Sequence, residues 1–215
     1  MAVSGVTTGM VVGLGTGRAA ARAIKALAAR VKAEQLEVRT VSTSRGSEEL
    51  ALALGLFVES FRDVDRVDYL FDGADEVDPR LRMIKGGGGA MTREKIVARE
   101  AARRVYLIDE SKLVSRLGEK RALPIEVVEF AVEAVLRRMD RLGLRGVVRM
   151  EGERPMHTDN GNQVVDATMV GVEDPERLAE SLDRISGIVE HGLFLSEADE
   201  VLIERADGSI ERRER

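Results

Sequence analysis

The first half of the chain alternates short apolar segments with longer amphipathic ones, and this alternation restricts the fold more than any other feature. Strands are expected at residues 10–14, 38–41, 67–71 and 105–108, and helices at residues 18–32, 48–54 and 92–104. Such an alternation predicts a parallel sheet covered by helices on both faces. Ligands of these sheets bind beyond the carboxyl ends of the strands. We therefore expect the functional residues in the loops that follow the strands.

The pattern changes near Gly118. A long helix is expected at residues 125–142 after Pro124, followed by strands at 147–150 and 163–167 and a helix at 175–185. These elements indicate a small α+β unit with an antiparallel sheet. We expect residues 192–195 and 200–204 to return to the first sheet as strands, and residues 210–215 to form a charged, solvated end.

The composition excludes several classes of protein. The chain has 33 Lys and Arg against 38 Asp and Glu, a net charge of −5, and only 3% aromatic residues, so it lacks the basic and stacking surfaces of nucleic-acid-binding proteins. No apolar run approaches the roughly 20 residues of a membrane span. The absence of cysteine rules out disulfides, thiolate metal sites and cysteine nucleophiles. We expect a soluble, cytoplasmic protein without nucleic-acid or membrane partners.

A glycine-rich loop, Gly13-Leu14-Gly15-Thr16-Gly17, joins the first strand to the first helix. Small residues allow backbone N–H groups to point at an anion, and the helix dipole adds to the attraction. The loop is not a dinucleotide fingerprint, because Arg18 stands where the third glycine belongs, nor is it a Walker loop. A tight turn that binds no ligand is the alternative. Similarly, the hydroxyl cluster from Ser42 to Ser47 is suited to binding phosphate or sugar oxygens, or Ser47 caps the next helix.

Two carboxylates, Asp72 and Asp75, flank Gly73 and Ala74 at the end of the third strand. Such a pair can hold sugar hydroxyls, act as acid or base, or bind a divalent cation. A divalent-cation site is disfavoured here, because no nearby histidine completes a typical set of metal ligands. An Asx turn with a helix cap would also explain the two residues.

Lys85 to Ala90 is the most unusual segment, since four successive glycines lose much backbone entropy on ordering. Close approach of the backbone to a ligand, with Lys85 as an adjacent cation, explains them better than a flexible linker. Glu94 then lies in the first turn of a helix, where the dipole favours a carboxylate and where it would also suit a proton-transfer base. The only histidines, His157 and His191, are expected to be structural.

Taken together, these segments resemble the signature blocks of the type A ribose-5-phosphate isomerase family. The blocks follow the family's order and cover nearly the whole chain: residues 13–17, 71–76, 85–90, 92–96, 109–112, 123–127, 158–162 and 192–194.

The resemblance implies an α/β fold: a Rossmann-like parallel-sheet catalytic domain at residues 1–120 and 191–215, with a smaller inserted α+β (ferredoxin-like) domain at 121–190 that takes part in oligomerisation. A homodimer or homotetramer is expected. The implied activity interconverts D-ribose 5-phosphate and D-ribulose 5-phosphate through an enediolate, in the non-oxidative branch of the pentose phosphate pathway. The family requires neither a metal nor another cofactor.

Matched by motif, Glu94 corresponds to the family's catalytic base, and Asp72 and Lys85 are also expected to be catalytic. The substrate-binding positions implied by the resemblance are Thr16, Gly17, Arg18, Ala19, Asp72, Gly73, Ala74, Asp75, Lys85, Gly86, Gly87, Gly88 and Lys112.

Two departures from the family pattern affect phosphate binding. Arg18 and Ala19 stand where the family usually has Ser-Thr, which removes two hydroxyl donors and adds a guanidinium able to bind phosphate. Family members usually have a longer helix before the first strand, whereas nine residues precede Met10 here and none is Lys or Arg. We expect altered substrate affinity and altered packing of the first sheet.

Two rival functions use the same motifs. A non-catalytic sugar-phosphate sensor would normally carry a DNA-binding module, for which the chain has no room, and it would not need Glu94. An enzyme similar to acyl-CoA transferases would use a carboxylate nucleophile, but the short chain and the Lys85–Glu94 block argue against it.

Overall fold

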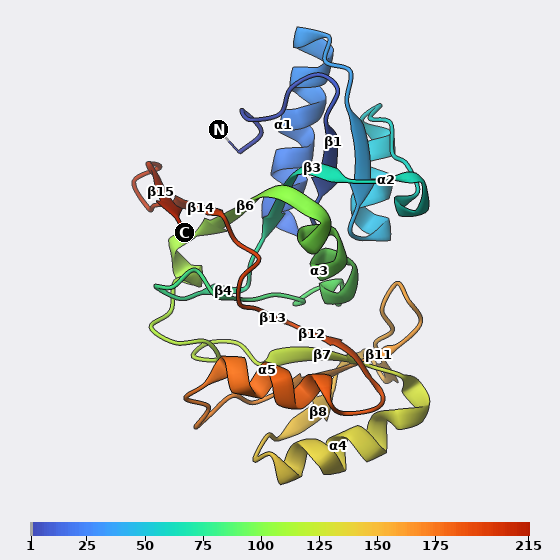
Figure 1. Ribbon diagram of the computed structural model, residues 1–215, viewed down its shortest axis with the longest axis vertical. Coiled ribbons are helices and arrows are strands. Elements are labelled where there is room, and N and C mark those ends of the chain that lie inside the picture. The colour runs from blue at the N-terminus through green and yellow to red at the C-terminus, as the bar shows by residue number, and fades with distance from the viewer. Residues whose placement is uncertain (1) are drawn as a thin grey trace. The chain divides into compact units, whose positions relative to one another are not determined.

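Two sheets with their helices form the framework of the two units into which the chain divides (Figure 1). The structure, a computed structural model, describes residues 2–215. The first unit runs up to Ala74 and adds Arg93–Ser111 and Glu197–Arg215, and the second comprises Asp75–Thr92 and Lys112–Ser196. Across residues 2–215, no helix combines the length and the apolar character needed to cross a bilayer.

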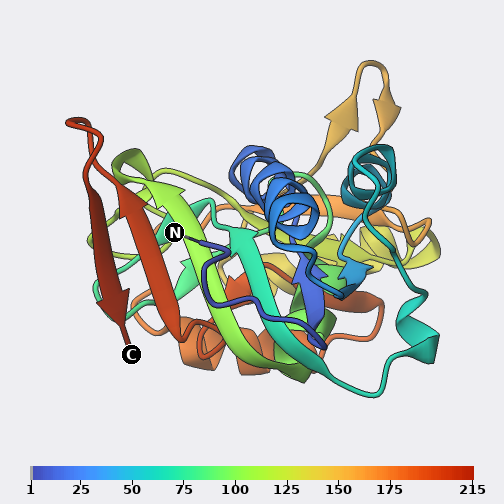
Figure 2. The same cartoon turned by 90° about the horizontal axis from the view of Figure 1, so that it is seen from above.

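The first unit contains a six-stranded sheet. Its elements are β1 (Val11–Leu14), α1 (Arg18–Glu34), β2 (Arg39–Ser42), α2 (Arg45–Ala53), η1 (Phe61–Asp63), β3 (Val67–Gly73), most of α3 (Met91–Glu100), β6 (Ala101–Asp109), most of η2 (Glu110–Lys112), β14 (Glu200–Glu204) and β15 (Ile210–Glu214). The strand order is β15-β14-β6-β3-β1-β2, and only β15 is antiparallel to its neighbour. Figure 2 shows β15, β14, β6 and β3 side by side. Because β1 lies between β2 and β3, the strand order reverses there.

Helices pack on both faces of this sheet, as the alternation in the sequence predicts. Val12 and Leu14 of β1 share a core with Ile24 and Leu27 of α1. Gly13 points to the other face, where a Cβ atom on it would lie 2.9 Å from the Val97 side chain of α3. The period of two along β1 therefore places α1 on one face and α3 on the other, and Figure 2 shows α1 and α2 together over the first. The expected Rossmann-like α/β class is confirmed by this sheet.

The second unit is built on antiparallel strands. Its elements are β4 (Glu76–Val77), β5 (Met83–Ile84), β7 (Leu123–Val127), η3 (Glu129–Ala131), α4 (Val132–Arg141), β8 (Gly146–Val148), β9 (Met150–Glu151), β10 (Arg154–Pro155), β11 (Gln163–Ala167), α5 (Pro175–Asp183), β12 (Ile188–His191) and β13 (Leu193–Phe194). Their sheets have the orders β12-β7-β11-β8, β13-β5-β4 and β10-β9.

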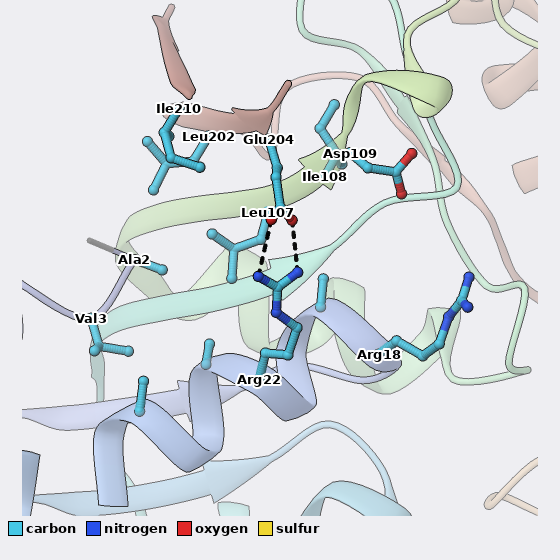
Figure 3. Close-up of a pocket in the computed structure, with 13 residues that line it drawn as sticks. Ala2, Val3, Arg18, Arg22, Leu107, Ile108, Asp109, Leu202, Glu204 and Ile210 are labelled. Atoms are coloured by element: carbon cyan, nitrogen blue, oxygen red, sulfur yellow. Dashed lines mark hydrogen bonds and ion pairs between the residues drawn. The ribbon is translucent and has the colours of Figure 1, made fainter. Parts of the chain in front are cut away.

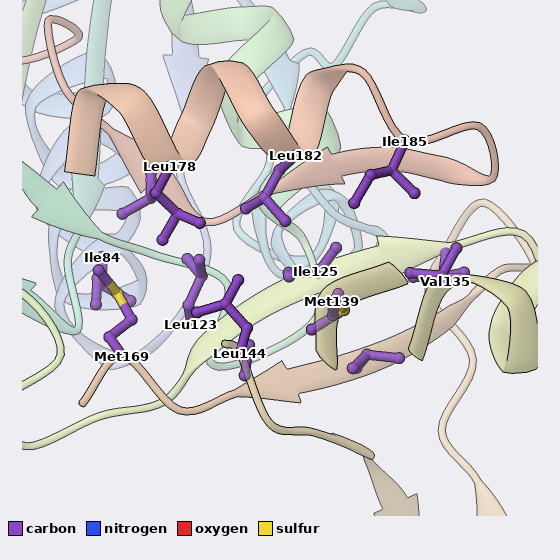
Figure 4. Packing of buried hydrophobic residues seen from close by; sticks show 14 of the residues in the cluster. Ile84, Leu123, Ile125, Val135, Met139, Leu144, Met169, Leu178, Leu182 and Ile185 are labelled. Carbon is purple, nitrogen blue, oxygen red and sulfur yellow. The ribbon is translucent and has the colours of Figure 1, made fainter. Parts of the chain in front are cut away.

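One face of the four-stranded sheet carries the core of the second unit. Alternate residues of β7, Leu123 and Ile125 among them, pack against Leu182 of α5 and Val135 and Met139 of α4 (Figure 4). Both helices therefore cover the same face of the sheet, and the intervening residues of β7 point away from them.

The helix expected at residues 125–142 is wrong in its first third. Residues 123–127 form the buried strand β7, and the α-helix begins only at Val132. Ile125 and Val127 are β-branched and suit a pleated strand, and every second residue of β7 packs in the core of the second unit, which is a period of two. No glycine or proline separates this strand from the helix, so the sequence does not mark the change of period.

Three other expectations also need correction. The helix expected at 92–104 ends at Glu100, and residues 101–104 already pair with β3 as part of β6. The tail is charged and largely exposed as expected, but residues 210–214 also form the edge strand β15 along β14. Residues 193–194 pair with β5 in the second unit and do not join the first sheet, although β14 does. Strand partners are set by contacts distant in sequence, so none of these outcomes has a local signal.

Asp199 ties the start of β14 to β6, and its loss should weaken the first unit in a pH-dependent way. Its carboxylate accepts from the backbone N–H and the guanidinium of Arg104 at 2.6–3.0 Å. Burial raises the pKa of Asp199, but the hydrogen bonds and charge of Arg104 outweigh it and hold the pKa below its ordinary value.

We predict that Asp199→Asn lowers the free energy of unfolding by about 1–2 kcal/mol at pH 7, after allowance for solvent screening. The stabilisation is complete above the unfolded pKa of about 3.9 and is lost as pH falls through the lower folded pKa. Urea unfolding of both proteins between pH 7 and pH 3 measures this. A difference that stays constant over that range would contradict the ion-pair explanation.

Candidate active site

The carboxyl ends of β1 and β3 meet where the strand order reverses, and the Asp72 carboxylate lies there. Its Oδ1 accepts hydrogen bonds from the backbone N–H groups of Thr16, at 2.9 Å, and Gly73, at 2.7 Å. The Asp72 side chain is fully buried. The loop after β1 and the end of β3 thus form one structure around a buried acid.

Gly15 is required by this arrangement. A Cβ atom at position 15 would lie 2.2 Å from Asp72 Oδ1 and 2.5 Å from the Asp72 Cα atom, so any side chain would displace the carboxylate. The sequence predicts that this loop cradles an anion. In the structure, the Thr16 N–H of this loop donates to the Asp72 carboxylate, which belongs to the protein and is not a bound ligand.

The hydroxyl cluster after β2 also contacts this loop. Thr16 Oγ1 lies 2.8 Å from both Thr43 Oγ1 and Ser44 Oγ. The residue that caps α2 is Ser44, whose hydroxyl accepts from the Ser47 N–H, so the cap predicted at Ser47 is displaced by one helical turn. The cluster therefore both caps α2 and fixes the side chain of Thr16.

The amino end of α1 follows directly after Thr16. Its N-cap, Gly17, has φ 96°, a conformation that glycine adopts without strain, and no side chain among residues 2–215 caps this helix. The N–H groups of its first turn, at Arg18 and Ala19, therefore remain available to an anion. Arg18 itself is exposed.

Tyr106 of β6 is a buried side chain on the strand next to Asp72. It is the register partner of Asp72 on the neighbouring strand, and it is fully buried. Burial, followed by the charges of Asp72 and Glu94, raises the pKa of Tyr106 well above its ordinary value. The phenol therefore stays neutral near pH 7. Glu94, in the first turn of α3, is 4% exposed.

In the second unit, the glycine run forms a tight turn beside Asp75. The N–H of Gly87 donates to Asp75 Oδ2 at 2.8 Å, and a Cβ atom on Gly87 would lie 2.7 Å from Asp75 Oδ1. Gly86 and Gly89 have φ values of 98° and 77°. Close approach and positive φ thus account for three of the four glycines, and the linker alternative is wrong.

Lys85 precedes this turn and is 2% exposed. Its Nζ lies 5.6 Å from the centroid of the Phe194 ring, within the range of a cation–π interaction. Its backbone N–H donates to the Gly192 carbonyl at 2.9 Å, and a Cβ atom on Gly192 would lie 2.2 Å from the Lys85 carbonyl oxygen. Residues 192–194 therefore hold both ends of Lys85.

A second buried acid, Glu126 of β7, is surrounded by neutral donors. Its carboxylate accepts from the hydroxyls of Thr92 and Thr158 and from the side-chain amides of Asn160 and Asn162. Thr92 is the second residue of α3, so this cluster holds the start of the helix that carries Glu94.

A cavity of about 590 Å³ in the first unit lies beside α1, and its chemistry does not suit a phosphorylated sugar (Figure 3). Its walls are largely apolar, with Val3, Leu107 and Leu202 among them. Arg22 within it is already paired with Glu204 through two hydrogen bonds, at 2.7 and 3.3 Å. Arg18 lines its edge and extends away from that pair in Figure 3.

In the second unit, Asp183, Glu190 and His191 place potential metal ligands within 4.8 Å of one another. His191 Nδ1 accepts from the Leu193 N–H, and Nε2 lies 3.2 Å from Asp183 Oδ1. In the neutral ring, the proton is therefore on Nε2 and leaves no lone pair for a metal. The arrangement fits a histidine that holds a turn.

The structure thus brings many of the expected residues together within each unit. The first unit groups Thr16, Asp72 and Gly73 and also contains the buried Glu94, while the second groups Asp75, Lys85, Gly86 and Gly87. Lys112 is half-buried at the end of η2 in the second unit.

Sequence reasoning missed Tyr106 and the role of Glu126. Tyr106 lies within an ordinary apolar strand and has no local signal. Glu126 carries one, because a charged residue between Ile125 and Val127 of a buried strand requires hydrogen-bond partners.

The chain is similar to known isomerases in sequence and in structure. Residues 39–208 match the model of the family described as ribose 5-phosphate isomerase A (phosphoriboisomerase A). The ribose-5-phosphate isomerase A of Sphingopyxis alaskensis is 46% identical over 206 residues, which cover 96% of this chain and 90% of that protein.

Two solved isomerase structures are also similar to this chain. Ribose 5-phosphate isomerase A of Methanocaldococcus jannaschii matches with a TM-score of 0.94 and 39% identity, over 100% of this chain and 95% of the other. A D-ribose-5-phosphate isomerase in complex with phospho-erythronic acid matches with a TM-score of 0.95 and 36% identity, over 100% of this chain and 94% of the other.

Replacing the buried Glu126 carboxylate by an amide should destabilise the protein. The amide group of Glu126→Gln would present N–H donors to neighbours that are themselves donors, at an expected cost of about 1–3 kcal/mol. Urea unfolding measures this. The control is Glu129→Gln, whose side chain is 66% exposed and which should change stability by less than about 0.5 kcal/mol. Equal effects of the two substitutions would contradict the role assigned to the cluster.

Proposed function

The chain belongs to the ribose 5-phosphate isomerase A family, and from that membership we propose which residues carry out each step of the isomerisation. It is an isomerase that interconverts D-ribose 5-phosphate and D-ribulose 5-phosphate. The sensor alternative gains no support, because the relatives that match are themselves named as isomerases.

Glu94 is the base that moves the proton. Aldose–ketose isomerisation transfers one proton between C1 and C2 through an enediolate, and a single carboxylate within reach of both carbons can remove and return it. The observation that carries this assignment is that Glu94 is a buried carboxylate in the first turn of α3, in the same unit as the buried Asp72, which lies where the strand order of the first sheet reverses. Such a reversal is where ligands bind in open α/β sheets.

Asp72 assists ring opening, and Lys85 stabilises charge. Asp72 is held by two backbone N–H groups at Oδ1, so its Oδ2 has a fixed position for proton exchange with the ring oxygen. Negative charge develops on the substrate oxygens as the enediolate forms, and a buried ammonium such as that of Lys85 would stabilise it. Asp75 binds sugar hydroxyls with its remaining acceptor capacity.

The phosphate binds at the amino end of α1. The N–H groups of Gly17, Arg18 and Ala19, the hydroxyl of Thr16 and the ammonium of Lys112 supply donors and positive charge. Binding the phosphate away from the reacting carbons provides energy that helps to position them. Gly73, Ala74 and Gly86–Gly88 contact the rest of the bound substrate.

Assembly into a homodimer or homotetramer, through the smaller domain at 121–190, is part of the proposal. Large apolar side chains remain exposed in that segment, including Phe130 at 99% and Val147 at 69%. Exposed apolar side chains of this kind are frequent where protein chains associate.

Sedimentation velocity should therefore give the mass of two or four chains, and Phe130→Ser should shift the population toward single chains. Phe57→Ser is the matched control, because Phe57 is 64% exposed but lies in the first unit. A wild-type protein that sediments as a single chain at micromolar concentration would refute the assembly.

Glu94→Gln should lower kcat for conversion of ribose 5-phosphate to ribulose 5-phosphate by about 10²–10⁴-fold, because the amide cannot accept the proton. The assay is run with EDTA. Glu100→Gln, exposed at the end of the same helix, should retain wild-type kcat. Substantial turnover by Glu94→Gln would disprove the assignment of the base.

A further inference from the structure

We propose that Arg149, anchored by Asp166, is a positioning residue that sets the peptide orientation of the glycine turn for catalysis. The inference rests on the proposed function, since it concerns the same turn at Gly86–Gly88. Neither Arg149 nor Asp166 is among the residues assigned above.

Arg149 contacts the turn through one nitrogen and Asp166 through the other two. Its Nη1 donates to the carbonyl oxygens of Gly86, at 3.0 Å, and Gly87, at 2.9 Å. Its Nε and Nη2 donate to the two oxygens of Asp166, at 2.8 and 2.5 Å. The Arg149 side chain is only 16% exposed. One planar guanidinium therefore joins β11 to two successive peptide groups.

The direction of these carbonyls determines where the following N–H groups point. In a trans peptide the C=O and the next N–H point in opposite directions, and residues 2–215 contain no cis peptide. The Gly86 carbonyl faces Arg149, and the Gly87 N–H accordingly donates away from it, to Asp75. By the same geometry, the Gly87 carbonyl turns the N–H of the exposed Gly88 away from Arg149.

The Gly86 carbonyl also accepts from the Gly89 N–H at 2.9 Å, so the Gly87–Gly88 peptide is the one that depends on Arg149, because glycine adopts many backbone conformations. Without the guanidinium, the Gly87–Gly88 peptide would be able to rotate and replace the N–H by a carbonyl oxygen on the substrate side. The fixed fork of Arg149 holds two carbonyls at once, which the single ammonium of a lysine does less well. A donor fixed in advance costs no reorganisation when charge develops on a substrate oxygen. Arg149 therefore supports the enediolate through the Gly88 N–H.

The experiment compares Arg149→Met, Arg149→Lys and Asp166→Asn with the wild type. Arg154→Met, an exposed arginine on β10, is the matched control. For each protein we would measure kcat and KM for ribose 5-phosphate, unfolding in urea, and the Kd of phospho-erythronic acid by calorimetry. The carboxylate of this probe places negative charge where the enediolate develops it.

A positioning role predicts that Arg149→Met lowers kcat by about 10–100-fold while KM changes less than about threefold. The Kd of phospho-erythronic acid should rise by about the same factor as kcat/KM falls. Arg149→Lys should be intermediate, and Arg154→Met should match the wild type. If Arg149→Met does not fold, Asp166→Asn should show a smaller change in the same direction.

Two outcomes would overturn the proposal. One is a variant with reduced stability but kcat and probe affinity within twofold of the wild type, which would make the contact purely structural. The other is a loss confined to KM. A failure of the proposed function gives a different result, because Glu94→Gln would then keep its turnover. The calorimetric comparison of the Arg149 variants tests the glycine turn in either case.

Discussion

The parallel pairing of β1 with both β2 and β3 is the constraint on which the rest of the structure depends. Because β1 is central to this reversal, the loop after it lies against the end of β3, and Gly15 packs on Asp72 with no room for a side chain. The Thr16 N–H then binds the Asp72 carboxylate, and Tyr106 on the adjacent strand lies beside it. The position of each group follows from strand order and register, so a slip of one residue in β3 would remove Asp72 from its donors.

Elements that are bounded by glycine residues could be predicted from the sequence. The strand, loop and helix at residues 10–32 are bounded by glycines and were predicted within one or two residues of β1 and α1. Prediction failed where no glycine or proline marks a boundary. Residues 125–128 continue into a helical pattern without either residue. Glu100 of α3 is followed directly by Ala101 of β6. Pairing partners, as for Leu193 and for Ile210, depend on residues far away in the chain.

The residues of the candidate site also divide into those that the sequence indicates and those that it does not. Asp72, Lys85, the glycines and Glu94 could be proposed from the sequence because charged residues and glycines cluster in two loops and at the start of a helix. Arg149 was not recognisable, since it lies over 60 residues from the carbonyls that it holds. Residues that position others have no characteristic pattern of their own, and only the folded chain brings them together.

The sheet of the first unit has a consequence for how the chain folds during synthesis. β6 pairs with β14, more than 90 residues later, whereas Lys112–Ser196 of the second unit leave the ribosome before β14 does. Until Glu200 emerges, β6 is an unpaired edge, and closing so long a loop carries a large entropy cost. Exposed edges of this kind can pair with other chains. Incomplete chains are therefore exposed to aggregation, and residues 200–215 protect the nascent protein as well as completing its sheet.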